Sequence, residues 1–290
     1  MTSLELVTLG GDGVEVEILP AVGARLHRLR VGEYDLLRTP PDLGRHVDDP
    51  YFWGSYPMAP WCNRIAAGRT ADVAGRMLDL PPSFPDGTAI HGQVSRVPWE
   101  QVDDRSFRIR AGGDGWPWRY EVVQRFEPAA NRLRLTLALT NVDDGPMPAG
   151  IGIHPWWRRP VRVAIDAATA YPSNLSTAAE PSPVTGDLDR RRIAEMPDGL
   201  DATWTDVGSP PVTLEWPAAG IRATLTTEPA VDHIVAASPG DIDAVAIEPQ
   251  THAPDAVRRL LNGERGGLGL LAPGETMRLA IRLAFESLET

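Results

Sequence analysis

The sequence contains no lysine, and all 28 of its basic residues are arginines. Schiff-base catalysis and the attachment of pyridoxal phosphate both require a lysine amine. A phosphate-binding loop of the Walker A type also requires its lysine. These three classes of chemistry are therefore excluded for this chain.

Cysteine, long apolar runs and excess positive charge are also missing. The single cysteine, Cys62, permits no intramolecular disulfide and fits a reducing cytoplasm, and we expect its thiol to be inert. The sequence has no run of ~18 apolar residues, so we expect no transmembrane helix. The acidic segment 1–20 lacks the pattern of a signal peptide. The net charge of −11 and the pI near 5.0 argue against nucleic acid or an anionic membrane as a partner. We expect a cytoplasmic protein.

Two further absences narrow the enzyme classes. The chain has six histidines, but none of them has the His-x-His or His-x₃-His spacing of a metal site. A serine hydrolase elbow of the form Gly-x-Ser-x-Gly is also missing. We therefore expect neither a metal nor another cofactor.

Strand patterns dominate what is present. Residues 132–139 read Arg-Leu-Arg-Leu-Thr-Leu-Ala-Leu, and residues 277–285 place five apolar side chains on one face. Such alternation predicts half-buried strands of antiparallel sheets. Weaker versions occur at 14–19, 120–126, 161–165 and 212–216. We predict an all-β protein, with residues 1–290 forming one large antiparallel β-sandwich domain, although the period does not distinguish a sandwich from a barrel.

Helix signals are scarce in this sequence. The best one is at 254–263, where Pro-Asp precedes a short apolar pattern that ends at a glycine. The segment 173–198 is rich in proline, serine and charge and could be read as a linker. We interpret it as a long loop within the domain, because motifs on both sides of it fit one site.

An acid and a base stand out among the polar residues. His154 and Glu248 each follow an apolar, strand-like run, and each is followed directly by a proline. A residue before proline is driven into extended backbone, so we expect both side chains to be held rigidly at strand ends. A histidine and a carboxylate presented in this way suit general acid–base catalysis near neutral pH.

Three weaker motifs carry one polar residue each. Arg64 lies in Asn-Arg-Ile, His91 precedes a glycine, and Asp201 follows Gly-Leu. Taken singly, each has an ordinary explanation as a surface arginine, a structural histidine or a turn aspartate. Their order along the chain is the stronger signal.

Together these five motifs resemble the aldose 1-epimerase (mutarotase) family, which has the galactose mutarotase-like β-sandwich fold. The elements that match are Asn63-Arg64-Ile65, His91-Gly92, His154-Pro155, Leu200-Asp201 and Glu248-Pro249. The resemblance implies that His154 is the general acid on the ring oxygen of an aldose and that Glu248 is the general base on the C1 hydroxyl. It also implies that sugar hydroxyls are bound by Arg64, His91 and Asp201, with Asn63 shaping the loop.

Aromatic and charged residues near these motifs indicate where the substrate could differ. Trp157 and Trp61 are the best candidates for stacking on a sugar ring, whereas we expect Trp99 and Trp216 to be core residues. Many family members carry Tyr-Phe where this chain has Trp156-Trp157. Several carry glutamine where Asp232 stands, so Asp232 could replace a sugar-binding glutamine. Arg158 and Arg159 could hold an anionic sugar, although a solvated strand end is the simpler interpretation.

The resulting hypothesis is an aldose 1-epimerase that interconverts the α and β anomers of a free monosaccharide without a cofactor. A sugar-phosphate 1-epimerase and a non-catalytic sugar-binding sensor or accessory domain are the alternatives. The presence of both His154 and Glu248 argues against a purely binding function, because binding alone needs no acid–base pair. We expect a monomer or a weak homodimer, and the sequence does not identify the aldose.

Overall fold

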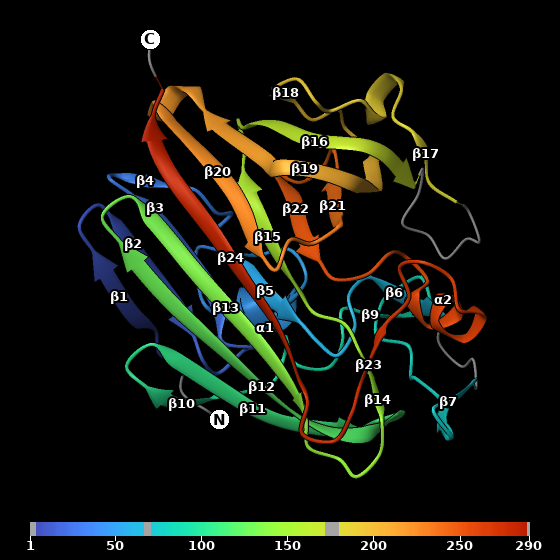
Figure 1. Ribbon diagram of the computed structural model, residues 1–290. Coiled ribbons are helices and arrows are strands. Elements are labelled where there is room, and N and C mark those ends of the chain that lie inside the picture. Colours follow the sequence, from blue (N-terminus) through green and yellow to red (C-terminus); the bar gives the residue numbers. More distant parts are fainter. Residues whose placement is uncertain (1–3, 67–70, 172–179, 289–290) are drawn as a thin grey trace.

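The computed structural model describes residues 4–66, 71–171 and 180–288, and β-strands make up most of their regular structure (Figure 1). The strands in the first part of the chain are β1 (Val7–Gly11), β2 (Val14–Leu19), β3 (Arg25–Val31), β4 (Tyr34–Asp35), β5 (Ser55–Met58), β6 (Arg64–Ala66), β7 (Ala71–Val73), β8 (Arg76–Leu78), β9 (Thr88–Ile90) and β10 (Glu100–Asp103). The middle part adds β11 (Ser106–Gly113), β12 (Trp116–Ala129), β13 (Arg132–Asn141), β14 (Met147–Ala149), β15 (Gly152–Arg158), β16 (Arg162–Tyr171), β17 (Ser182–Pro183) and β18 (Ala194–Glu195). The last part adds β19 (Leu200–Trp216), β20 (Ile221–Glu228), β21 (His233–Ser238), β22 (Ala244–Gln250), β23 (Gly269–Leu271) and β24 (Thr276–Ser287).

Helices are few and short in the described residues. They are α1 (Arg45–Asp48), α2 (Ala256–Asn262) and the 3₁₀ segments η1 (Gly186–Leu188) and η2 (Pro217–Ala219). The helix predicted at 254–263 is confirmed as α2. It ends before Gly263, whose backbone has the left-handed conformation that glycine adopts readily. Within these ranges, none of the helices is long and apolar enough to cross a membrane.

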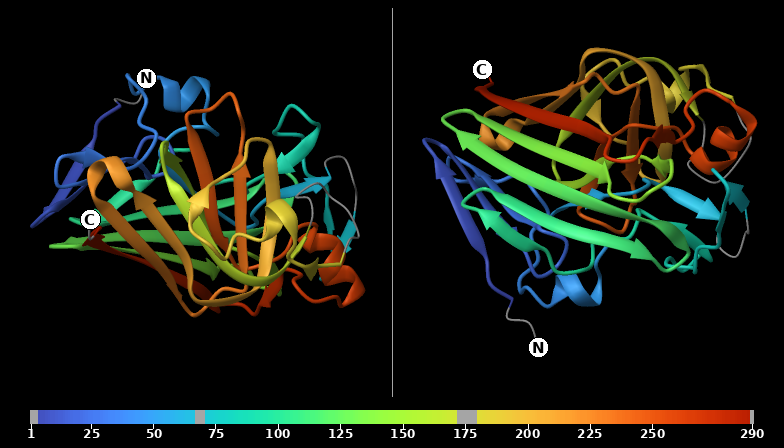
Figure 2. Two further views of the ribbon diagram at one scale, coloured as in Figure 1. Left: turned by 90° about the horizontal axis from the view of Figure 1, so that it is seen from above. Right: turned by 60° about the horizontal axis from the view of Figure 1, so that its bottom comes forward.

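Most of the strands belong to one large, curled antiparallel sheet, which confirms the all-β prediction. From one edge the neighbours run β1, β2, β3, β5, β15, β22, β21 and β19. The sheet then continues through β20, β24, β13, β12, β11 and β10. Figure 1 shows β11, β12, β13, β24 and β20 side by side, and Figure 2 shows the curl from two further directions.

The 17-residue strand β19 joins the run of strands that starts at β1 to the run that ends at β10. Its first part, 200–205, pairs with β21, whereas its last part, 212–216, pairs with β20. Strand β16 lies along both parts, with a register shift at Ile165/Ala167. Such an irregularity bends a strand, so β19 and β16 form the corner at which the sheet turns over its own core.

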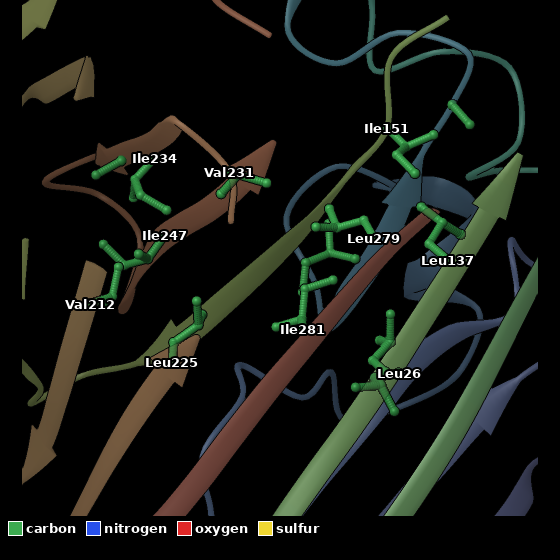
Figure 3. Close-up of a cluster of buried hydrophobic side chains, with 14 of the residues drawn as sticks. Leu26, Leu137, Ile151, Val212, Leu225, Val231, Ile234, Ile247, Leu279 and Ile281 are labelled. Carbon is green, nitrogen blue, oxygen red and sulfur yellow. The ribbon is translucent and has the colours of Figure 1, made fainter. Parts of the chain in front are cut away.

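The alternating leucines of β13 form the centre of this core. Antiparallel pairing places Leu133, Leu135 and Leu137 opposite Leu283, Ile281 and Leu279 of β24, and all six are at most 5% exposed. Figure 3 shows Leu137, Leu279 and Ile281 in the cluster of buried side chains. Each fully buried side chain of this size contributes about 1.5–3 kcal/mol from the removal of apolar surface from water. The alternation in the sequence therefore identified the core face correctly.

The segment 173–198 is only partly described. Residues 173–179 lie outside the described residues. Of the remainder, β17 and β18 pair with β16, and η1 lies between them. This part of the predicted loop therefore contains short strands that extend the edge of the sheet.

A separate two-stranded sheet of β6 and β9 positions the residues around 63 and 91. Strands β6 and β9 pair with Arg64 opposite Ile90, so the adjacent residues Asn63 and His91 lie close together. Gly92 then passes over Ala59 so closely that a β-carbon at Gly92 would lie 1.9 Å from the carbonyl oxygen of Ala59. Only glycine fits this approach, and its φ of +72° also favours glycine.

This close approach predicts that Gly92→Ala is strongly destabilising. The matched control is Gly87→Ala, because Gly87 has a φ of +83° but no atom within 4 Å of the place that a β-carbon would occupy. The control isolates the backbone strain, about 1–2 kcal/mol. We expect Gly92→Ala to lower the free energy of unfolding by about 1–3 kcal/mol more than the control does. Equal effects of the two variants in urea unfolding would contradict the close-packed arrangement.

All six histidines of the chain are buried, each at most 7% exposed. Burial disfavours the charged imidazolium and lowers every one of their pKa values. The pKa values of His27, His233 and His252 fall to about 4, that of His154 to about 3, that of His46 to about 2, and that of His91 well below its usual value. The histidines are therefore harder to protonate in the folded chain than in the unfolded chain.

This difference predicts a loss of stability in mild acid. A depressed folded-state pKa contributes stability above the unfolded value of about 6.5, and this contribution is lost as the pH falls towards the folded value. Each histidine then lowers the free energy of unfolding by up to about 1.4 kcal/mol per pH unit. Urea unfolding at about pH 7 and about pH 5 measures the change before most ordinary carboxylates titrate. Equal or greater stability at the lower pH would contradict the burial of neutral histidines.

Candidate active site

The register of two neighbouring strands brings His154 and Glu248 together. Strand β15 pairs with β22 so that Gly152 faces Gln250 and Trp156 faces Ala246, which sets His154 directly opposite Glu248 on the same face. Nε2 of His154 lies 3.1 Å from Oε1 of Glu248, and the side chains are only 6% and 2% exposed. The structure therefore unites the acid and the base that the sequence indicated.

The two prolines act differently from our expectation. His154 and Glu248 lie within β15 and β22 and not at strand ends, because both strands continue through Pro155 and Pro249. A proline has no N–H to donate to a neighbouring strand. The pairing of β15 with β22 is interrupted between Gly152 and Trp156, which is the stretch that contains both prolines and both polar side chains.

An open cleft of about 290 Å³ lies over this pair. The strand register explains its floor, because Trp156, Ala246, Ala237 and Asp201 form one cross-strand row next to the row of His154 and Glu248. The two alanines leave space between the tryptophan and the aspartate. The described residues that line the cleft are Tyr51, Phe52, Tyr56, Asn63, Arg64, Phe84, Ile90, His91, His154, Trp156, Gly199, Leu200, Asp201, Val235, Ala237, Pro239 and Glu248.

Asn63 and His91 are held in fixed orientations at the side of the cleft. The backbone N–H of Asn63 donates to Nδ1 of His91 at 3.2 Å, so the hydrogen of the neutral imidazole is on Nε2. The Asn63 side-chain oxygen accepts the backbone N–H of Arg64 at 2.8 Å. The His91 ring meets that of His154 edge to face, with their centroids 4.9 Å apart. His91 is therefore prepared to donate one hydrogen bond to a ligand.

Arg64 is positioned by a carboxylate that the sequence analysis did not identify. Its Nε donates to Oδ2 of Asp86 at 2.9 Å, and its Nη1 lies 3.8 Å from Oδ2 of Asp201. Asp86 also accepts hydrogen bonds from the backbone N–H and the hydroxyl of Thr88. The sequence signal for Asp86 is only that of an Asp-Gly turn, which gives no indication of its contact with Arg64.

Burial favours the state in which the His154–Glu248 pair holds one proton in total. Burial, assisted by the Asp201 carboxylate, raises the pKa of Glu248 well above its usual value, although Arg64 opposes this effect. Burial lowers the pKa of His154 to about 3. A neutral imidazole beside a protonated carboxyl contains the same single proton as an imidazolium beside a carboxylate. Moving that proton within the pair converts one form into the other.

Tyr56 and Arg25 lie in a row beside His154. The ring of Tyr56 stacks on that of His154, with the centroids 4.6 Å apart, and the guanidinium of Arg25 lies 5.2 Å from the centre of the Tyr56 ring. Arg25 is fully buried and donates to the carbonyl oxygens of Val22, Pro50 and Ser95. Neither Tyr56 nor Arg25 was identified from the sequence, because their contacts join segments that are distant along the chain.

Two predicted substrate contacts are not at the cleft, and they are corrections to the sequence analysis. Trp157 is 1% exposed and packs on Trp216 in the core, because its side chain faces away from that of Trp156, which lines the cleft instead. Asp232 precedes β21, forms an ion pair with Arg265 and accepts the backbone N–H of Asp206. It therefore lies outside the part of β21 that faces the cleft.

The remaining candidates are also outside the cleft. Trp61 is 2% exposed and stacks on Trp116. Arg159 pairs with Asp198 and donates to the hydroxyl of Ser238, and Arg158 is exposed. Within the described ranges, no group of three or more histidine, cysteine, aspartate or glutamate side chains could hold a metal ion.

The chain is similar to known proteins over most of its length. Residues 5–284 match the family model of aldose 1-epimerases. The chain is 28% identical over 249 residues to the uncharacterized protein YphB of Escherichia coli K12, and the match spans 80% of this chain and 83% of that one.

Solved structures share the fold at lower identity. A galactose mutarotase-like protein from Clostridium acetobutylicum superposes with a TM-score of 0.82 at 18% identity, over 97% of this chain and 94% of that one. Galactose 1-epimerase from Lactobacillus acidophilus superposes with a TM-score of 0.77 at 17% identity, again over 97% and 94%. At such identities these matches establish the galactose mutarotase-like fold. Because the family model spans residues 5–284, the chain belongs to the aldose 1-epimerase family.

Proposed function

We propose that the protein is a mutarotase that interconverts the α and β anomers of a free aldose. The observation that carries this proposal is the buried His154–Glu248 pair, whose atoms lie 3.1 Å apart beneath an open cleft. Ring opening requires one proton to leave the C1 hydroxyl and one to reach the ring oxygen. A pair that holds one mobile proton meets both requirements.

The reaction balances within this pair. The Glu248 carboxylate takes the proton from O1 while the His154 imidazolium gives its proton to O5, the C1–O5 bond breaks and the aldehyde C1=O1 forms. The pair is then neutral, which is the state that burial favours. Rotation about the C1–C2 bond presents the other face of the aldehyde, and the reverse proton transfers close the ring.

The side of the cleft supplies the binding groups in this proposal. Arg64 and the Nε2 hydrogen of His91 donate to sugar hydroxyls, and Asp201 accepts from them. Asn63 holds the two donors in place, because its backbone N–H binds His91 and its side-chain oxygen binds the backbone N–H of Arg64. The sugar-phosphate alternative is disfavoured. Arg64 is the only arginine among the described residues that line the cleft, and it already pairs with Asp86, while Asp201 would repel a phosphate.

Substitution of the pair tests the proposal and separates it from a sugar-binding sensor. We expect Glu248→Gln and His154→Asn each to lower kcat by ~10²-fold or more, because each removes a proton-transfer group. Arg64→Ala should mainly raise KM, because it removes binding to the ground state. The matched control is Glu215→Gln, since Glu215 is also buried but pairs with Arg222 outside the cleft.

Polarimetry of freshly dissolved α-sugars measures these rates. Wild-type protein that binds sugars but leaves anomer exchange at the buffer rate would support the sensor instead. Mutarotation that persists in the Glu248→Gln, His154→Asn double variant would show that other residues catalyse the reaction.

The shared proton also predicts a broad pH plateau for kcat/KM. Acid adds a second proton to the pair only near the depressed His154 pKa of about 3, and base removes the single proton only above the raised Glu248 pKa. Between these limits the pair keeps one proton and the rate stays constant. A narrow bell with limbs at the ordinary values, about 4.3 for glutamate and about 6.5 for histidine, would contradict the neutral pair.

A further inference from the structure

Trp156, Tyr56, Tyr51 and Phe52 form one side of the cleft, which we call the aromatic edge. None of these side chains has a free hydrogen-bond donor. Nε1 of Trp156 donates to the carbonyl oxygen of Tyr51 at 2.6 Å, and the hydroxyl of Tyr56 donates to the same oxygen at 3.2 Å. The hydroxyl of Tyr51 donates to the carbonyl oxygen of Ser83 at 2.8 Å. Each of these side chains therefore presents mainly ring surface to the cleft.

Phe52 completes this edge. Its ring packs on that of Trp156 with the centroids 5.8 Å apart, and its side chain is half-buried. The guanidinium of Arg38 donates to the Phe52 carbonyl oxygen at 2.6 Å, which fixes the backbone of the loop before β5. The loop therefore holds an apolar side chain at the mouth of the cleft.

The strand order decides which part of a sugar meets this aromatic edge. The strands that form the floor lie in the order β5, β15, β22, β21 and β19. His154 is on β15, Glu248 is on the next strand, β22, and Asp201 is two strands further on β19. With O5 at His154 and C1 at Glu248, the C2 and C3 hydroxyls extend towards Asp201.

The substituent on C5 must then extend in the opposite direction. C5 is bonded to O5 on the side away from C1, so its substituent lies beyond His154, over β15 and β5. This is the edge formed by Trp156, Tyr56 and Phe52. A hydroxyl group there would face ring surface with no free donor from these three side chains, whereas a methyl group would bury its surface against the rings.

We propose that the preferred substrate is a 6-deoxyaldohexose, whose C5 carries a methyl group in place of a hydroxymethyl group. This inference rests on the proposed mutarotase function and names the substrate class for the same site. A carboxylate or a phosphate on C6 fits least, because a charge at this edge would be desolvated against aromatic rings.

Matched sugars test the inference directly. D-Fucose and D-galactose differ only in the oxygen on C6, as do D-quinovose and D-glucose, and D-xylose carries hydrogen on C5. We expect kcat/KM to be about 10-fold higher for the 6-deoxy member of at least one pair, the scale of one unpaired hydroxyl, with D-xylose below D-quinovose. Equal or lower values for both 6-deoxy sugars would overturn the inference, and D-xylose above D-quinovose would overturn the assignment of a methyl group.

A pair of variants links the preference to the aromatic edge. Phe52→Gln introduces an amide donor of nearly the same size as the leucine in Phe52→Leu, so the two variants differ mainly in hydrogen bonding. We expect the glutamine to bring the 6-deoxy preference at least 3-fold closer to unity than the leucine does, by satisfying the hydroxyl on C6. The same preference in both variants would contradict the role of this edge.

The outcomes separate the two proposals. If no sugar in the panel mutarotates faster than in buffer, the proposed function fails. If the sugars are turned over without a 6-deoxy preference, only the substrate inference fails.

Discussion

The contact between His154 and Glu248 depends on the pairing of two strands, and the rest of the site is arranged around it. A shift of one residue in the register of β15 against β22 would turn one of the two side chains to the other face of the sheet. The buried leucines of β13 with their partners on β24, and the corner at β19 and β16, resist such a shift. They do so because they fix which face of the curled sheet is buried. The hydrophobic core therefore positions the His154–Glu248 pair.

Burial gives this pair its chemical character. A charged carboxylate or imidazolium in this position loses hydration, so both side chains favour the neutral form. Beside the pair, Arg64 lies between the carboxylates of Asp86 and Asp201. The site thus combines a buried histidine–glutamate pair with a polar side and an aromatic edge, and β15 contributes both His154 and Trp156.

The sequence predicted the parts of the structure that depend on local pattern. The alternation at 132–139 and 277–285 identified β13 and β24, and the motifs around Arg64, His91, Asp201 and Glu248 identified residues that line the cleft. It was wrong about Trp157 and Asp232, because the face of a side chain depends on where its strand begins and how it pairs. Residues such as Asp86 and Arg25 could not be found, since their partners are distant in the sequence.

The most direct test of the account is magnetisation transfer between the two anomeric protons of a substrate in D₂O, with the protein at catalytic concentration. The account predicts that the protein accelerates exchange between the α and β protons and that the proton on C2 is retained, because only the C1–O5 bond opens. It also predicts that exchange returns to the buffer rate in the Glu248→Gln, His154→Asn double variant. Loss of the C2 proton to solvent, or undiminished exchange in that variant, would contradict the central claim that this pair opens and closes the sugar ring.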